Sequence, residues 1–160
     1  NMTTNENLYA PNILSKKLSI KCDELDQNID DLLKEKLIKS IGNRCLKEGY
    51  VNGDTINIIS RTIGTINPNH FNGEVYYNVQ YEAQICNPIK DMNIQCKIKN
   101  INQLGIMAEV DCLTIVVAKQ YIDESRSLDS FSIGQDINIS IVGSRFDLND
   151  KYITIIGRLS

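Results

Sequence analysis

The sequence has no tryptophan, a single histidine and no Cys-x-x-Cys spacing. Structural zinc sites need four closely spaced Cys or His ligands, so we expect no metal site. The cysteines are odd in number and widely spaced, which disfavours a disulfide framework. We expect reduced, mostly buried thiols and an intracellular, reducing compartment. The five cysteines are Cys22, Cys45, Cys86, Cys96 and Cys112.

A surplus of basic residues is also missing. Lys and Arg number 17 against 20 Asp and Glu, giving a formal net charge of −3. This balance excludes a strongly basic nucleic-acid-binding module, so any such site must be a local patch. Neither a signal peptide nor an apolar run long enough to span a bilayer is found, and we expect no membrane association.

The sequence gives little support for an enzyme. A Cys–His catalytic pair would need His70, which lies in a polar segment without a catalytic cysteine motif around it. The acidic residues are scattered and form no metal-binding motif. We therefore expect no catalytic residues and no cofactor.

One long helix is predicted near residues 25–41. Its apolar residues recur with helical period, acidic residues crowd its start, and lysines lie toward its end. Gly42 supplies a stop signal. The apolar positions are Leu25, Ile29, Leu32, Leu33, Leu37 and Ile41.

The rest of the first part, residues 1–83, is predicted to form strands around 13–20, 54–63 and 74–85. Apolar and polar residues alternate through 77–85, which is typical of a strand with one buried face. The segment "GTINPNHFNG" (64–73) contains the glycine, proline and asparagine of a connecting loop. The first part is therefore predicted to be α+β.

The second part, residues 84–160, is predicted to contain strands alone. Period-two alternation marks 94–99 and 137–141, and the runs "GIMAEV" and "LTIVVA" lie between them. "KYITIIG" closes the chain after the turn "FDLND". Five short strands in this length suggest a small closed barrel, with 100–122 as its second and third strands and a bend at Gly105.

Three collinear segments resemble a known family. They are "YNVQYEAQICNPIK", "INQLGIMAEVDCLTIVVAKQYI" and "IGQDINISIVGSRFDLNDKYITIIGRL". With the strand–helix–strand part before them, they resemble the stalk subunit of multisubunit RNA polymerases, a family formed by the seventh-largest subunit of eukaryotic RNA polymerase II and its archaeal counterpart. The resemblance implies an α+β tip domain followed by an OB-fold barrel, over about residues 8–159.

The resemblance also implies partners and a docking site. The tip domain of this family docks on the large polymerase subunits, and its barrel guides nascent RNA. Cellular members pair with a small helical subunit, whereas some large DNA viruses carry an unpaired version. The expected location is the nucleus, or the cytoplasm or virion for a viral protein. Matching the docking loop here are Gly64, Ile66, Pro68, Phe71 and Gly73.

RNA binding is expected to be weak. Family members often carry aromatic residues after the barrel glycine, where this chain has Ile106 and Met107, with Val116 and Val117 on the next strand. Base stacking contributes about 1–3 kcal/mol per base, and these positions cannot provide it. The remaining candidates are Lys97, Lys99, Lys119, Tyr121, Arg145 and Lys151. A stand-alone OB-fold RNA-binding or translation-related protein is the alternative, which the tip-like first part and the net charge disfavour.

Overall fold

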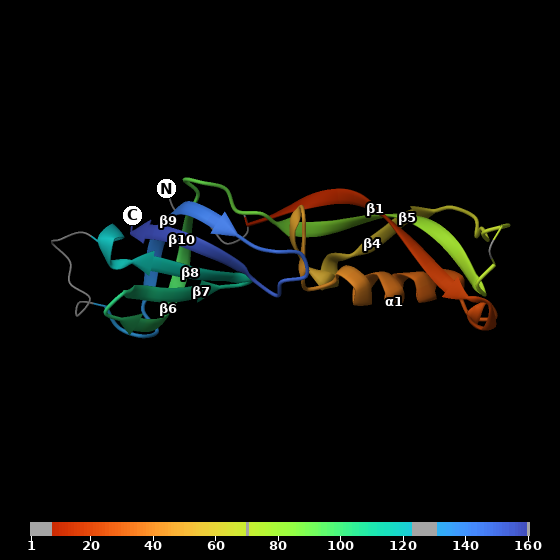
Figure 1. Ribbon diagram of the computed structural model, residues 1–160. Coiled ribbons are helices and arrows are strands. Elements are labelled where there is room, and N and C mark those ends of the chain that lie inside the picture. Colours follow the sequence, from red (N-terminus) through yellow and green to blue (C-terminus); the bar gives the residue numbers. More distant parts are fainter. Residues whose placement is uncertain (1–7, 70, 123–130, 160) are drawn as a thin grey trace. The chain divides into compact units, whose positions relative to one another are not determined.

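A computed structural model describes residues 8–69, 71–122 and 131–159. The chain divides into two compact units (Figure 1). The barrel unit comprises Asn1–Ala10, Arg44–Tyr50 and Cys86–Ser160, and the helix unit comprises Pro11–Asn43 and Val51–Ile85. The division of the chain into a tip domain and an RNA-contacting domain stays a prediction.

The helix unit combines one helix with long strands. Strand β5 (Glu74–Cys86) is hydrogen-bonded to β1 (Tyr9–Lys21) and, antiparallel, to β4 (Asn57–Arg61). Arg61 of β4 joins this sheet to α1 (Ile29–Ile41), because its Nε donates to Asp30 Oδ1 at 2.6 Å. Its guanidinium also lies 5.4 Å from the centre of the Tyr77 ring of β5.

The helix is shorter than the sequence predicts. It begins at Ile29 because the side chain of Asn28 accepts hydrogen bonds from the amides of Asp30 and Asp31. The preceding residues form a 3-10 turn (Cys22–Glu24), and Leu25 is exposed instead of belonging to the apolar stripe. The predicted stop is confirmed, because the helix ends at Ile41 and Gly42 is its C-cap, with its amide donating to the Ile38 carbonyl.

The alternation along β5 is confirmed. Tyr77, Val79, Tyr81, Ala83 and Ile85 are all buried, and the residues between them are more exposed. The predicted first strand also forms, although β1 begins earlier, at Tyr9. The sequence did not predict the short antiparallel pair β2 (Cys45–Leu46) and β3 (Gly49–Val51), because two- and three-residue strands are too short to show a period.

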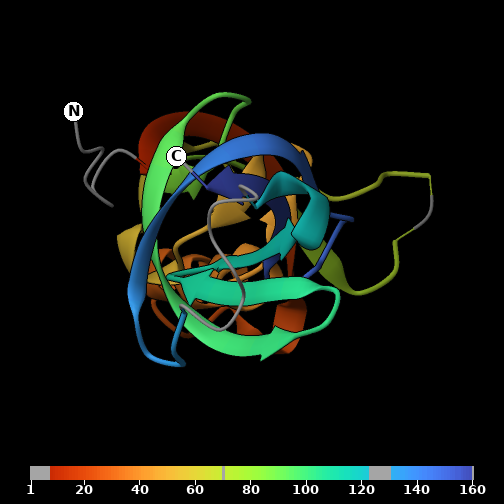
Figure 2. The same ribbon diagram turned by 90° about the vertical axis from the view of Figure 1, so that its left-hand side faces the viewer.

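The predicted closed barrel is confirmed. Its strands are β6 (Asn93–Asn102), β7 (Gly105–Val110), β8 (Leu113–Ala118), β9 (Asp136–Arg145) and β10 (Ile153–Leu159). They close in the order β10-β8-β7-β6-β9, and the ring is seen end-on in Figure 2. β8 and β10 pair in parallel, and the other neighbours are antiparallel. This is the arrangement of the five-stranded Greek-key OB-fold barrel.

Isoleucines from every strand fill the barrel. Ile98, Ile115, Ile139 and Ile155 are fully buried, and Ile106 is 1% exposed. β-branched side chains suit such a wall because they are stiff and pack well on a pleated surface. The alternation predicted for β6 and β9 is confirmed by the burial of their apolar positions.

Gly105 is the first residue of β7, directly after the turn that connects it to β6, the first barrel strand. Its φ is +148°, and a Cβ there would lie 2.1 Å from the Val117 carbonyl oxygen of β8. The expected need for glycine is therefore confirmed. The turn between β7 and β8 instead contains Asp111, whose φ is +52°. Among the described residues, no helix is long and apolar enough to cross a membrane.

Candidate functional site

The loop between β4 and β5, residues 62–73, is held at both ends; we call it the tip loop. Thr65 and Tyr76 exchange two backbone hydrogen bonds, of 2.9 and 2.7 Å. Near its far end, the Gly73 carbonyl accepts from the amide of Cys22 at 2.9 Å. A loop fixed in this way loses less conformational entropy when a partner binds.

The tip loop carries large apolar side chains on its surface. Ile63 is 85% exposed, Ile66 53% and Phe71 57%. The predicted docking residues Ile66, Pro68 and Phe71 are thus all exposed. Ile63 was assigned to a strand in the sequence prediction, yet β4 ends at Arg61. The position of Ile63 between the end of a strand and Gly64 was the sequence signal that could have identified it as a loop residue.

Polar residues alternate with these apolar residues along the tip loop. Asn67 Oδ1 accepts from the amide of Asn69 at 3.0 Å, forming a tight turn around Pro68. Asn72 Nδ2 donates to the Tyr76 hydroxyl at 2.7 Å, and the Tyr76 ring lies 4.7 Å below Lys17 Nζ. Exposed apolar residues next to hydrogen-bonded polar ones have the composition of a protein interface anchor.

The two predicted loop glycines have different roles. Gly73 has a φ of +83°, and a Cβ there would meet nothing within 4 Å. Gly64 instead allows close packing, since a Cβ would lie 2.6 Å from Val75 Cγ1 and 2.9 Å from the Tyr77 hydroxyl. Both glycines shape the loop, and their contribution to docking stays a prediction.

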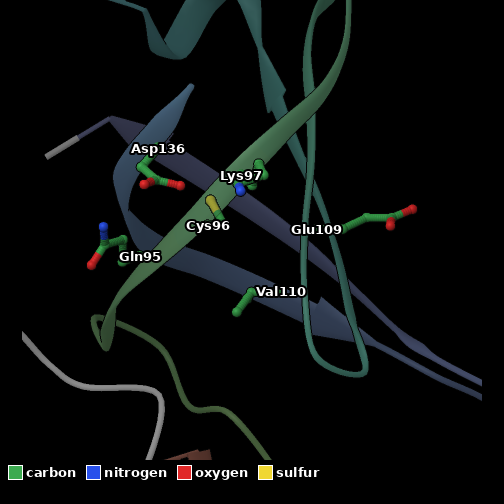
Figure 3. A pocket seen from close by; sticks show the side chains of 6 residues that line it. All are labelled: Gln95, Cys96, Lys97, Glu109, Val110 and Asp136. Atoms are coloured by element: carbon green, nitrogen blue, oxygen red, sulfur yellow. The ribbon is translucent and has the colours of Figure 1, made fainter. Parts of the chain in front are cut away.

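On the barrel wall, Lys97 lies between two carboxylates. It is paired across β6–β7 with Glu109 and across β6–β9 with Asp136. Figure 3 shows these two side chains on the two sides of Lys97. Directly opposed residues have Cβ atoms only about 5 Å apart, so both carboxylates weaken the positive potential at Lys97.

The same residues line a shallow hollow of about 340 Å³. Its lining is Gln95, Cys96, Lys97, Glu109, Val110 and Asp136 (Figure 3). With two carboxylates and one ammonium group, this hollow has a net negative charge and does not suit a phosphate group.

An apolar row crosses the outside of the second, third and fifth strands of the barrel. Met107 pairs with Val116, which pairs with Ile156, and these side chains are 40%, 38% and 46% exposed. The prediction that Ile106 and Val117 share this outer surface is wrong, because both point into the core. Strand alternation places only every second residue outside.

The other candidate RNA contacts are spread over the barrel. Arg145 pairs with Thr154 near the start of β10, and Lys151 lies in the loop just before that strand. Lys119 follows the far end of β8, where its amide donates to the Leu104 carbonyl. Lys99 is exposed on β6. The fold therefore does not gather these cations into one patch, and the side chain of Tyr121 lies outside the described residues.

Buried thiols affect the pH dependence of stability. Burial, assisted by the charge of Asp136, raises the pKa of Cys96 to about 12, and burial chiefly raises the pKa of Cys45 to about 11. In the unfolded chain a thiol ionises near pH 8.5. Between these values the unfolded state binds fewer protons, so the stability present at neutral pH is lost as pH rises.

We expect the free energy of unfolding to fall by about 1.4 kcal/mol per pH unit and per thiol from pH ~9 upward. Urea titrations under reducing conditions between pH 7 and 11 measure this slope. Cys96→Ala should make it shallower, whereas Cys22→Ala, at an exposed position, should not change it. Equal slopes for the two variants would contradict the assignment to Cys96.

Within the described residues, no group of three or more His, Cys, Asp or Glu side chains is placed to hold a metal ion. No family model matches the sequence. The chain is similar to a protein of Acanthamoeba polyphaga mimivirus named "Putative DNA-directed RNA polymerase subunit". The two are 26% identical over 166 aligned positions, which cover 96% of this chain and 83% of the viral protein.

Proposed function

We propose that this chain is a non-catalytic subunit of a DNA-directed RNA polymerase and forms its stalk. The observation that carries the proposal is the similarity to a viral protein named as a polymerase subunit, which extends over 96% of this chain. A closed barrel with OB-fold strand order, after a unit of one helix and long strands, is what the stalk family would require.

In this role the tip loop docks on the large polymerase subunits. Ile63, Ile66 and Phe71 are exposed apolar groups on a loop that is already held in place. Nucleotide transfer then belongs to the large subunits, and a small helical subunit is a further candidate partner. Because the similar protein is viral, the cytoplasm or the virion is the proposed location.

Co-purification tests the polymerase role. The tagged full chain, expressed in its native setting, is expected to recover the two largest polymerase subunits in stoichiometric amounts. Recovery of ribosomes or of free RNA without polymerase subunits would instead support the stand-alone RNA-binding or translation protein.

The barrel contributes weak, charge-dependent contacts to nascent RNA. The outward row of Met107, Val116 and Ile156 has no ring for bases to stack on, and Lys97 lies between carboxylates. For single strands, the logarithm of affinity changes with the logarithm of salt by about −0.7 per phosphate neutralised. Two to four phosphates would give a slope of roughly −1.4 to −2.8.

The double variant Lys97→Glu, Lys99→Glu is expected to flatten this slope. Fluorescence anisotropy of a short single-stranded RNA at several salt concentrations measures it. Glu109→Gln is the matched control on the same wall, and it should strengthen binding because it removes a carboxylate opposite Lys97. Tight, salt-insensitive binding by all variants would contradict a charge-based contact.

A further inference from the structure

Two Asn-Gly pairs occur in the chain, Asn52–Gly53 and Asn72–Gly73, and each is followed by an acidic residue. Glycine has no side chain, so it leaves its own amide nitrogen unshielded. That nitrogen can attack the side-chain carbonyl carbon of the preceding asparagine and form a cyclic imide. The two pairs share one turn, because in each the asparagine Oδ1 accepts from the amide two residues later at 3.1 Å. They differ in the surroundings of the glycine amide.

The Gly53 amide is engaged, whereas the Gly73 amide is open. Gly53 is buried and its amide donates to Asn43 Oδ1 at 3.0 Å, so it can react only when this segment opens locally. Gly73 follows the exposed Asn72, its φ is +83°, and a Cβ there would meet nothing within 4 Å. In the part of the chain that the structure describes, the Gly73 amide donates to no acceptor. Of the two pairs, Asn72–Gly73 is therefore the one that the fold leaves free to react.

Two further groups contact the Asn72 side chain where this reaction needs them. The Glu74 amide, which donates to Oδ1, stabilises the negative charge that develops on this oxygen during the attack. The Tyr76 hydroxyl lies 2.7 Å from Nδ2, the nitrogen that has to leave. This hydroxyl also donates to Glu74 Oε2 at 3.1 Å, and Lys17 Nζ lies 4.7 Å from the centre of the same ring. A proton donor is thus held at the leaving group.

We propose that Asn72–Gly73 is a self-modification site, at which the chain converts Asn72 to aspartate and isoaspartate. The Gly73 nitrogen gives its proton to hydroxide and attacks Asn72 Cγ, so that a new C–N bond forms. The Cγ–Nδ2 bond then breaks, and ammonia leaves with a proton from the Tyr76 hydroxyl, which water protonates again. Water finally opens either C–N bond of the imide ring. In sum, one amide and one water give one carboxylate and one ammonium ion.

The modification changes the end of the tip loop that joins β5. Both products replace the Asn72 amide with a carboxylate beside that of Glu74, so the hydrogen bonds to Glu74 and Tyr76 are lost and like charges repel. Isoaspartate also inserts a methylene group into the main chain directly before Gly73, whose carbonyl accepts from the Cys22 amide. We therefore expect this end of the tip loop to loosen as the protein ages. The inference is independent of the polymerase role.

The test incubates the folded full chain at neutral and at mildly alkaline pH, followed by peptide mapping and labelling with isoaspartate methyltransferase. We expect the peptide that contains Asn72 to gain the mass difference between an amide and an acid and to separate into two isomers, faster at the higher pH. Asn52 should react at least about tenfold more slowly, because its reaction waits for local opening. In urea the two sites should react at similar rates, since the unfolded chain protects neither.

Two variants assign the roles of the neighbouring groups. Asn43→Gly removes the acceptor of the Gly53 amide at a position whose φ of +54° suits glycine, and it should speed the reaction at Asn52. Tyr76→Phe keeps the ring but removes the proton donor, and it should slow the reaction at Asn72 by about tenfold or more. Equal rates at the two sites in the folded chain, a faster reaction at Asn52, or an unchanged rate in Tyr76→Phe would each overturn the proposal.

Discussion

Gly105→Val is expected to destabilise the barrel by about 3–5 kcal/mol. A Cβ at this position would lie 2.1 Å from the Val117 carbonyl oxygen, and φ is +148°, which L side chains rarely adopt. The clashing atom belongs to the backbone ladder between β7 and β8, so it cannot move without breaking their pairing. Backbone strain and overpacking each cost roughly 1–3 kcal/mol.

Alanine substitutions at three glycines of the barrel unit separate the steric clash of the Cβ from the strain of a positive φ. Gly105→Ala already carries the clash and the unfavourable φ. Gly134→Ala carries an unfavourable φ of +90° with open space around the Cβ, and should cost about 1–2 kcal/mol. Gly143→Ala has neither and should change stability by less than about 0.5 kcal/mol. Urea denaturation measures the free energy of unfolding of each variant and so ranks the three. Equal losses of stability at all three sites would contradict the steric argument.

Replacing both Ile66 and Phe71 by alanine is expected to abolish stable incorporation into the polymerase. Each side chain is more than half exposed, so its removal opens no core cavity and should leave the melting temperature nearly unchanged. Buried anchors at interfaces typically contribute about 1–3 kcal/mol or more each. Their combined loss would weaken assembly by roughly 30-fold to 10⁴-fold.

Quantitative pull-down of the large subunits, with the unmodified chain as competitor, measures this effect. Leu148→Ala is the matched control, because Leu148 is a similarly exposed apolar residue on a loop of the barrel unit. Pro68→Ala should have a smaller effect than Phe71→Ala, because it removes less apolar surface. Unchanged incorporation of the Ile66, Phe71 double variant would disprove tip-loop docking.

The strands and the loop could be predicted from the sequence because their signal is local. Alternation in 77–85, 94–98 and 137–141 reports directly which side chains are buried, since successive residues of a strand face opposite sides. The glycine, proline and asparagine residues of 64–73 likewise specify a loop without any tertiary contact. The helix start was misjudged because Asn28 was not recognised as the cap that precedes Ile29.

Which side chains lie beside one another on the barrel wall depends on the register between paired strands. The sequence of a single strand does not encode that register. Lys97 looked like an RNA contact in the sequence, and only the pairing of β6 with β7 and β9 places Glu109 and Asp136 beside it. Ile106 and Val117 were placed on the outer wall because the polar residues Glu109 and Thr114, which mark the outward phase of the two runs, were overlooked. Closure of the barrel fixes that phase, because Ile106 and Val117 pair with each other and point inward together.

The sequence by itself determined the classes of residue, the strand periods and the need for glycine at position 105. Only the tertiary structure decided which distant groups meet. Tyr9 is widely separated along the chain from Asp111 and Cys112, which its hydroxyl contacts, and no spacing rule connects them. Folding of the barrel unit brings them together, because burying the apolar faces of all five barrel strands in one core also packs Tyr9 against that core.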